Sequence, residues 1–241
     1  MSADRFFTDF DRFTGMIAEG VPFSYGRYAD GEVALMQGQP IGPETQAGSV
    51  DRWTAPDKLT LAGIHLRWSF NPLRYESSYY AISAPSDSIS DYEYLYSMAK
   101  NKGNITFANL WINANYGRML DFYRNFNRGA YVICNERANP EKFPFAVKGM
   151  LPQSDDIVNV YENMYPHILK SIELFCKKLK GETVFIACGP LSAVYAICMF
   201  SHNPENQYID VGSSLDEYIH GRKTRPYMDP QSGYANMVSH F

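Results

Sequence analysis

The run of residues 184–200 contains no charged side chain and is interrupted at its middle by Gly189-Pro190. It is somewhat short of the ~20 apolar residues that a membrane-spanning helix needs. The sequence therefore predicts a buried strand, a turn and a buried helix here, with no membrane span. A strand followed directly by a helix is the unit from which α/β proteins are built.

The rest of the chain repeats this alternation of strand and helix. Helical spacing of phenylalanines predicts an opening helix that carries Phe6, Phe7, Phe10 and Phe13. We expect the further helices at 31–37, 59–68, 90–100, 115–126, 164–179, 192–200 and 215–219, and strands at 23–28, 79–83, 105–110, 130–134, 183–187 and 207–211, with 105–134 as a βαβ unit. This pattern predicts a single α/β domain over 1–241, Rossmann-like, with a mostly parallel sheet and helices on both faces.

Composition excludes several classes of protein. The chain of 241 residues has a net charge of −4 and a pI near 5.7, which argues against a dedicated nucleic-acid binder. Its four cysteines have no metal-ligand spacing, and its first 20 residues carry charges where a signal peptide needs an apolar stretch. We therefore expect a cytoplasmic protein in a reducing compartment; the oligomeric state is left open.

Two carboxylates flank a glycine directly after the first predicted strand, in the sequence Asp30-Gly31-Glu32. Such a pair suits Mn²⁺ or Mg²⁺, which proteins often hold through one or two carboxylates, water and substrate phosphate. The same residues also suit a helix start, where Asp caps the first amides and Glu favours the positive end of the helix dipole. Both interpretations stay open from spacing alone.

Residues 38–56 follow this acidic pair and are rich in glycine and proline, with few apolar side chains. Loops of this length in compact domains tend to be functional or disordered. The segment is either a substrate-covering loop or a plain surface excursion.

The turn at Gly189-Pro190 predicts a second ligand-binding feature. Ligands collect at the carboxyl ends of parallel strands, and the first amides of a helix attract phosphate. Gly189 would allow close backbone approach, Pro190 suits the first helical turn, and Ser192 could add a hydroxyl. The sequence contains no G-x-G-x-x-G or Walker pattern. The Gly-Pro pair could therefore equally be a turn that only ends the strand and starts the helix.

The third feature is the segment 207–227, in which a predicted strand ends at Asp210. The acidic pair Asp216-Glu217 follows, and then a basic cluster formed by Arg222, Lys223 and Arg225. These cations could neutralise a pyrophosphate leaving group, or they could form a solvated charged tail.

Together the three segments resemble the GT-D-type glycosyltransferase fold family. The motifs that carry the resemblance are Arg27-x-x-Asp30-Gly31-Glu32, Gly189-Pro190 and Ile209-Asp210-Val211-Gly212. The chain departs from the family pattern at Tyr28-Ala29 and at Ser213-Ser214. The resemblance implies a metal-dependent hexosyl- or pentosyltransferase that uses a nucleotide sugar, typically a UDP-sugar, with Asp30 and Glu32 at the metal and diphosphate.

Glycosyl transfer needs positive charge on the departing diphosphate and, for an inverting path, a carboxylate that takes the acceptor proton. Besides the metal, Arg27, Lys223 and Arg225 can supply the charge. Asp210, Asp216 and Glu217 are the candidates for the base, and the sequence does not rank them. The acceptor would be a glycan or a glycoprotein.

Two other functions fit the same residues. A metal-dependent phosphate or nucleotide hydrolase would use the same acidic pair with water as the acceptor. A non-catalytic nucleotide-binding module would bind without turnover.

Overall fold

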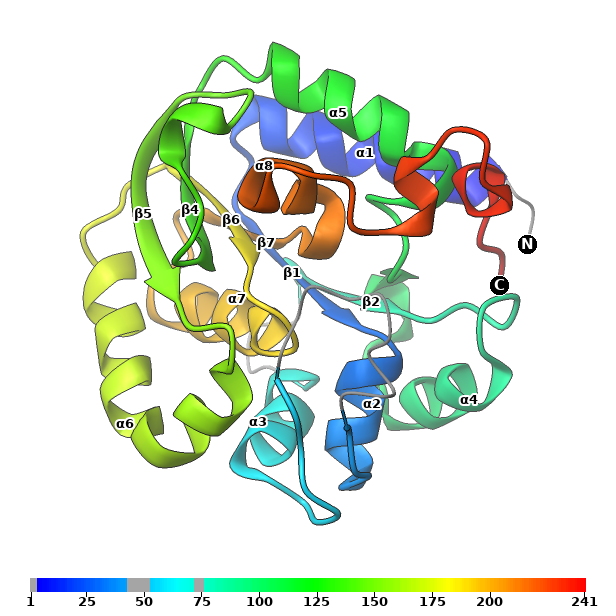
Figure 1. Cartoon of the computed structure of the whole chain (residues 1–241), viewed down its shortest axis with the longest axis vertical. Coiled ribbons are helices and arrows are strands. Elements are labelled where there is room, and N and C mark those ends of the chain that lie inside the picture. The colour runs from blue at the N-terminus through cyan, green and yellow to red at the C-terminus, as the bar shows by residue number, and fades with distance from the viewer. Residues whose placement is uncertain (1–3, 43–52, 72–75) are drawn as a thin grey trace.

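The computed structural model describes residues 4–42, 53–71 and 76–241. Its centre is a seven-stranded sheet in the order β3-β2-β1-β7-β6-β4-β5, and every pair of neighbouring strands is parallel (Figure 1). The strands are β1 (Phe23–Tyr28), β2 (Ser78–Ile82), β3 (Ile105–Phe107), β4 (Ala130–Asn135), β5 (Val147–Gln153), β6 (Thr183–Ala187) and β7 (Gln207–Asp210).

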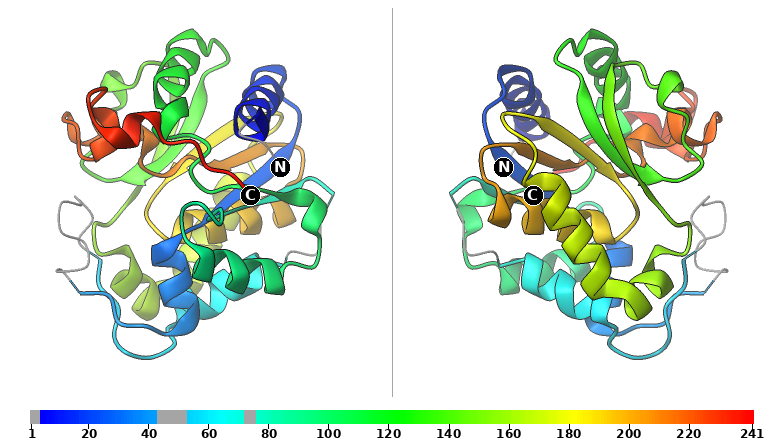
Figure 2. Two further views of the ribbon diagram at one scale, coloured as in Figure 1. Left: turned by 90° about the vertical axis from the view of Figure 1, so that its right-hand side faces the viewer. Right: turned by 90° about the vertical axis from the view of Figure 1, so that its left-hand side faces the viewer.

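Helices cover both faces of this sheet (Figures 1 and 2). One face carries α1 (Asp4–Glu19), α5 (Tyr116–Asn125) and α8 (Asp216–His220). The other face carries α2 (Asp30–Gln37), α3 (Leu61–Ser69), α4 (Ile89–Met98), α6 (Ile157–Cys176) and α7 (Leu191–His202). The predicted α/β fold with helices on both faces is confirmed.

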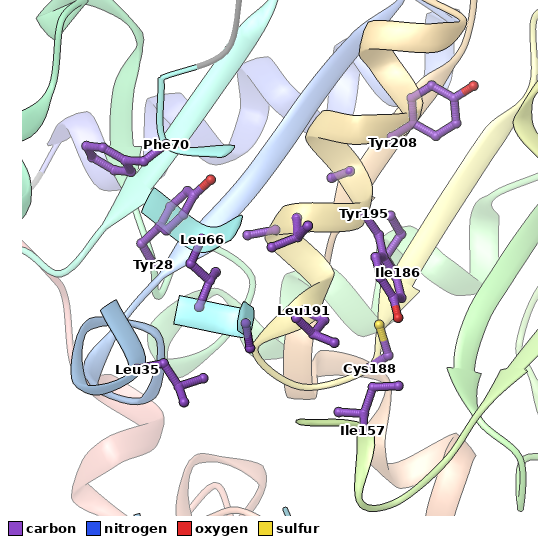
Figure 3. Close-up of a cluster of buried hydrophobic side chains, with 14 of the residues drawn as sticks. Tyr28, Leu35, Leu66, Phe70, Ile157, Ile186, Cys188, Leu191, Tyr195 and Tyr208 are labelled. Carbon is purple, nitrogen blue, oxygen red and sulfur yellow. The ribbon is translucent and has the colours of Figure 1, made fainter. Parts of the chain in front are cut away.

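Strand β6 shows why both faces must be covered, because its alternate side chains enter two different cores. Phe185 packs in the core beneath α1 and α5, whereas Val184 and Ile186 pack in the core on the α7 side. Figure 3 shows that second core, in which Leu191 and Tyr195 lie beside the end of β6. Strands buried on both faces read as continuous apolar runs, which is the pattern that the sequence shows here.

The strand, turn and helix predicted for residues 183–200 are confirmed, and every residue of α7 from 191 to 200 is buried. Although α7 is apolar, no helix among the described residues is long and apolar enough to cross a membrane.

One strand was not predicted, and two expected boundaries were wrong. Strand β5 was missed because it is an edge strand, paired only with β4 and half-exposed, in which Gly149 and Pro152 interrupt the apolar pattern. Helix α6 begins at Ile157, not 164, because its first turns bury Ile157, Val158 and Tyr161. Strand β3 ends at Phe107, not 110, because Leu110 N–H donates to the Phe107 carbonyl in a turn.

The expected βαβ unit over 105–134 also needs correction. Strands β3 and β4 are not neighbours, since β2, β1, β7 and β6 lie between them. The last two strands of the chain insert between the two halves of the sheet, so the strand order reverses at β1 and β7. Ligands of open α/β sheets bind at such a reversal, outside the carboxyl ends of the strands.

Helix α2, which carries the acidic pair, is held by close contact with α3. A Cβ atom placed on Gly63 would lie 2.1 Å from the backbone oxygen of Leu35. Gly63→Ala is therefore expected to lower the free energy of unfolding by about 1–3 kcal/mol, the usual cost of overpacking. Gly15 of α1 is the control, because its Cβ would meet nothing within 4 Å. Gly15→Ala should raise stability by about 0.5–1 kcal/mol. Equal effects of the two changes in urea unfolding would contradict the close packing.

Candidate active site

A cleft with a volume of about 810 Å³ opens at the carboxyl ends of the central strands. Every strand near the reversal contributes to its lining, through the residue that ends the strand or the loop that follows it. The lining includes Arg27, Asp30 and Glu32 from β1 and α2, Gly189 and Pro190 after β6, and Asp210, Asp216 and Arg225 from β7 and beyond. The structure thus brings together eight residues that the sequence had singled out.

Arg27 stands at the centre of this cleft. Its Nε donates to the carbonyl of Ala108 at 2.7 Å, and its Nη1 lies 4.0 Å from Oδ1 of Asp210. The side chain is only 15% exposed. Burial opposes its charge, but Asp210 and Glu32 more than offset this and raise the pKa of Arg27. The guanidinium therefore stays a fixed cation between the strands.

Gly212 is required by the position of Arg27. Its φ of +50° lies in the left-handed region, and a Cβ atom there would sit 1.4 Å from Nη1 of Arg27. The glycine of the Ile-Asp-x-Gly strand end thus leaves the space that the guanidinium occupies.

Asp210 is almost fully buried and binds two backbone amides. Its Oδ2 accepts from Arg27 N–H at 3.1 Å, and its Oδ1 accepts from Gly212 N–H at 3.0 Å. Burial raises the pKa of Asp210 to about 7; Arg27 opposes this rise and Glu32 adds to it.

The two carboxylates of α2 have different surroundings. Ala29 is the N-cap, and its N–H donates to Oε2 of Glu32 at 2.9 Å, so Glu32 closes the first turn as in a capping box. Burial raises the pKa of Glu32, with Arg27 opposing. Asp30 is exposed, and its side chain has no hydrogen bond or ion pair among the described residues. The helix-start interpretation therefore holds for Glu32, whereas Asp30 faces the cleft.

A cation at this pair would need ligands from outside the protein. Within 4–42, 53–71 and 76–241, no group of three or more His, Cys, Asp or Glu side chains could hold a metal. Asp30 and Glu32 offer two carboxylates, which matches the sparse protein coordination of Mg²⁺ when phosphate oxygens and water complete the shell.

Around Gly189 the backbone turns with φ +65°, which favours glycine. Pro190 is the N-cap of α7. Ser192 is fully buried, and its Oγ accepts from Cys188 N–H at 2.9 Å, so its hydroxyl supports the turn and does not reach the described cleft lining.

The segment after β7 divides the remaining candidates. Asp216 lines the cleft, and its Oδ2 accepts from Thr224 Oγ1 at 2.8 Å and from Arg225 Nε at 3.3 Å. Glu217 instead accepts from the hydroxyl of Tyr116 at 3.2 Å and does not belong to the described lining. Lys223 is exposed and likewise outside it.

The sequence marked Trp53 only as one of several aromatic side chains that could stack on a sugar ring, and it did not single out the other lining residues. Trp53 is buried at the end of the expected loop 38–56, close enough that a Cβ on Gly31 or on Gly189 would touch its indole. Residues 43–52 of that loop lie outside the described residues. The described parts on either side of them pair through an antiparallel bridge between Ile41 and Ala55. Asp87, Asn109, Asn113 and Tyr234 also line the cleft. Asn109 and Asn113 come shortly after β3, and polar residues after a strand could have indicated the site. The predicted strand ran to residue 110, however, and so included Asn109.

Solved structures share this fold at low sequence identity. A selenomethionine-substituted structure of domain of unknown function 1792 matches with a TM-score of 0.58 and 14% identity, over 88% of this chain and 80% of that one. A structure of the same domain described as having "a distinct glycosyltransferase fold" matches with a TM-score of 0.56, 14% identity and the same coverage. A protein from Streptococcus sanguinis described as a new glycosyltransferase matches with a TM-score of 0.53 and 9% identity, over 90% and 85%.

The chain has this glycosyltransferase fold. No protein-family model matches the sequence, and a search of curated proteins finds no match. The expected Rossmann-like fold is thus confirmed. Sequence identities of 14% or less do not identify the sugar donor or a metal.

A double-mutant cycle tests the packing of Gly212 on Arg27. Gly212→Ala should cost the backbone strain of a left-handed residue, about 1–2 kcal/mol, plus the cost of displacing the guanidinium. Gly181→Ala is the control, because φ is +65° there but nothing lies within 4 Å of its Cβ. In an Arg27→Ala background, we expect the two alanine changes to cost the same in denaturant unfolding. A difference that persists without Arg27 would show that another contact constrains Gly212.

The buried carboxyl of Asp210 predicts a pH dependence of stability. An aspartate titrates near 3.9 in an unfolded chain, so between about pH 4 and pH 7 the folded protein binds more protons at Asp210 than the unfolded chain does. The free energy of unfolding should therefore fall as the pH rises through this window, by up to about 4 kcal/mol. Asp210→Asn should flatten this slope in urea unfolding at several pH values. An unchanged slope would assign the dependence to other groups.

Proposed function

We propose that this protein is a metal-dependent glycosyltransferase that moves a sugar from a nucleotide diphosphate sugar, a UDP-sugar, to a glycan or glycoprotein. The observation that carries the proposal is the meeting of Asp30, the Gly189 turn and two arginines in one cleft of a glycosyltransferase fold. Carboxylates, helix amides and guanidinium groups are the three kinds of group that bind a metal diphosphate.

On the donor side, Asp30 and Glu32 would hold Mn²⁺ or Mg²⁺ together with the diphosphate. The ion supplies positive charge to the leaving group when it is bound. Arg27 and Arg225 supply fixed positive charge in the same cleft, and the turn at Gly189-Pro190 offers backbone approach at the amino end of α7.

For an inverting path we favour Asp216 as the base. It lines the cleft, and its hydrogen bonds with Thr224 and Arg225 fix its orientation. Asp210 also lines the cleft, but both of its oxygens accept from backbone amides, which makes it a positioning residue for Arg27. Glu217 bonds to Tyr116 outside the described lining and is the weaker candidate.

Calorimetry with UDP tests the donor site. Mn²⁺ should strengthen UDP binding to the wild-type protein, and Asp30→Asn or Glu32→Gln should remove at least about tenfold of that gain, or ~1.4 kcal/mol. Glutamine at position 32 keeps an oxygen for the Ala29 amide, so the helix cap survives. Asp121→Asn on the surface of α5 is the charge-matched control and should change nothing.

Equal UDP affinity with Mn²⁺ and with chelator would remove the metal from the proposal. Turnover of a UDP-sugar that is independent of added acceptor would instead identify a hydrolase. Binding without any turnover would identify a nucleotide-binding module.

A further inference from the structure

The cleft extends past Arg27 into a second half that the proposed donor site does not use. In the strand order β3-β2-β1-β7-β6, the loops after β2 and β3 lie on the opposite side of β1 from the Gly189 turn after β6. We call this part the outer half. Its described lining is Ser86, Asp87, Asn109, Ile112 and Asn113 together with Tyr234 and Met237.

Asn113 is the informative residue of the outer half. Among the described residues it is the one non-glycine residue with positive φ, at 54°. It is 6% exposed, and its side-chain amide has no hydrogen-bond partner in the described part of the chain. The side-chain amide atoms of Asn113 are not among the fully buried polar atoms without a partner, so they reach solvent on the cleft side. Because Asn113 lines the cleft, its amide is available to a molecule bound there.

Asn109 is held in a defined orientation beside it. Its Nδ2 donates to Oδ2 of Asp87 at 3.2 Å, and the hydroxyl of Ser239 donates to the same oxygen at 2.8 Å. The side-chain oxygen of Asn109 has no hydrogen-bond donor among the described residues. The outer half therefore presents the Asn109 amide in a fixed orientation, together with the Asn113 amide, which has no protein partner among the described residues.

Tyr234 adds an aromatic surface to these polar groups. It is 54% exposed, and it lies on the segment that the bond from Ala114 N–H to the Met237 carbonyl ties to the Asn113 turn. An exposed ring beside fixed amides matches the two sides of a pyranose, whose C–H face is apolar and whose edge carries hydroxyls.

The charge of the outer half excludes a second phosphate site. None of its seven described lining residues is a Lys, Arg or His, and Asp87 is its one charged side chain. These residues offer an anionic ligand no positive charge, whereas a neutral polyhydroxylated ligand needs none.

We propose that the outer half binds a neutral saccharide, the acceptor of the transfer, with Asn113 bonding its hydroxyls and the ring of Tyr234 stacking on its C–H face. The role as acceptor rests on the proposed function; the binding of a saccharide does not. Asn113 would then be a specificity-determining residue, since its amide loses bound water when a sugar enters and is left unpaired by a sugar that lacks the matching hydroxyl.

Nuclear magnetic resonance of ¹⁵N-labelled full-length protein tests this inference. The probes are the methyl glycosides of glucose, galactose, N-acetylglucosamine and rhamnose, and separately UDP with Mn²⁺. We expect at least one glycoside to shift the Asn113 side-chain amide, and Asn113→Gly to weaken that glycoside at least tenfold. Glycine keeps the left-handed backbone, so the melting temperature should be unchanged. Asn113→Asp, which also tolerates this backbone, should weaken binding as well.

Tyr234→Leu should weaken the same glycoside, whereas Tyr94→Leu on α4, outside the cleft lining, should not. UDP affinity should stay within twofold in all variants. The inference is overturned if no glycoside shifts Asn113, if Asn113→Gly binds the glycoside as the wild type does, or if UDP itself occupies Asn113. If glycosides bind at Asn113 but UDP does not bind at all, the donor assignment fails and the saccharide site stands.

Discussion

The arrangement of the strand ends around the cleft depends on the contacts of the Arg27 guanidinium. The guanidinium leaves the end of β1, donates to the loop after β3 through Ala108, and faces Asp210 at the end of β7. Three strand ends that are distant in sequence thus share one buried cation. Breaking a buried pair by removing one partner is costly because the other charge stays desolvated. The arginine therefore fixes the spacing between the donor half of the cleft and the outer half.

Glu32 combines two functions that usually occupy separate residues. Its carboxylate closes the first turn of α2 through the Ala29 amide, and it lies beside Arg27 in the cleft. The same hydrogen bond that stabilises the helix also holds the carboxylate in place for a cation. The neighbouring Asp30 makes no such bond in the described residues and depends on α2 for its position.

The sequence predicted features that depend on neighbouring residues, such as strands and the turns after them. It missed features that depend on the order of the strands in the sheet. Strands β1 and β6 were found with their observed bounds because each is a short segment rich in aromatic or aliphatic side chains that is followed within a few residues by a helix. The edge strand β5 lacks that signal. In the site, Asp30 and Gly189 were found because each follows its strand directly, and the alternation of elements sets such ends at one edge. Neither Asn113 nor Trp53 follows a strand end directly, so this signal did not mark them. They reach the cleft through the position of β3 in the sheet and through packing between distant segments.

The packing of Gly212 against Arg27 also has a consequence for how such sequences can diverge. A side chain at position 212 and a guanidinium from position 27 exclude each other in space. A side chain at position 212 would force the guanidinium out of its place between the strands, so the observed position of Arg27 goes with glycine at 212; the left-handed φ of +50° favours glycine there even without the arginine. The two positions lie 185 residues apart in the sequence and yet constrain each other through space, a coupling that no contiguous motif would show.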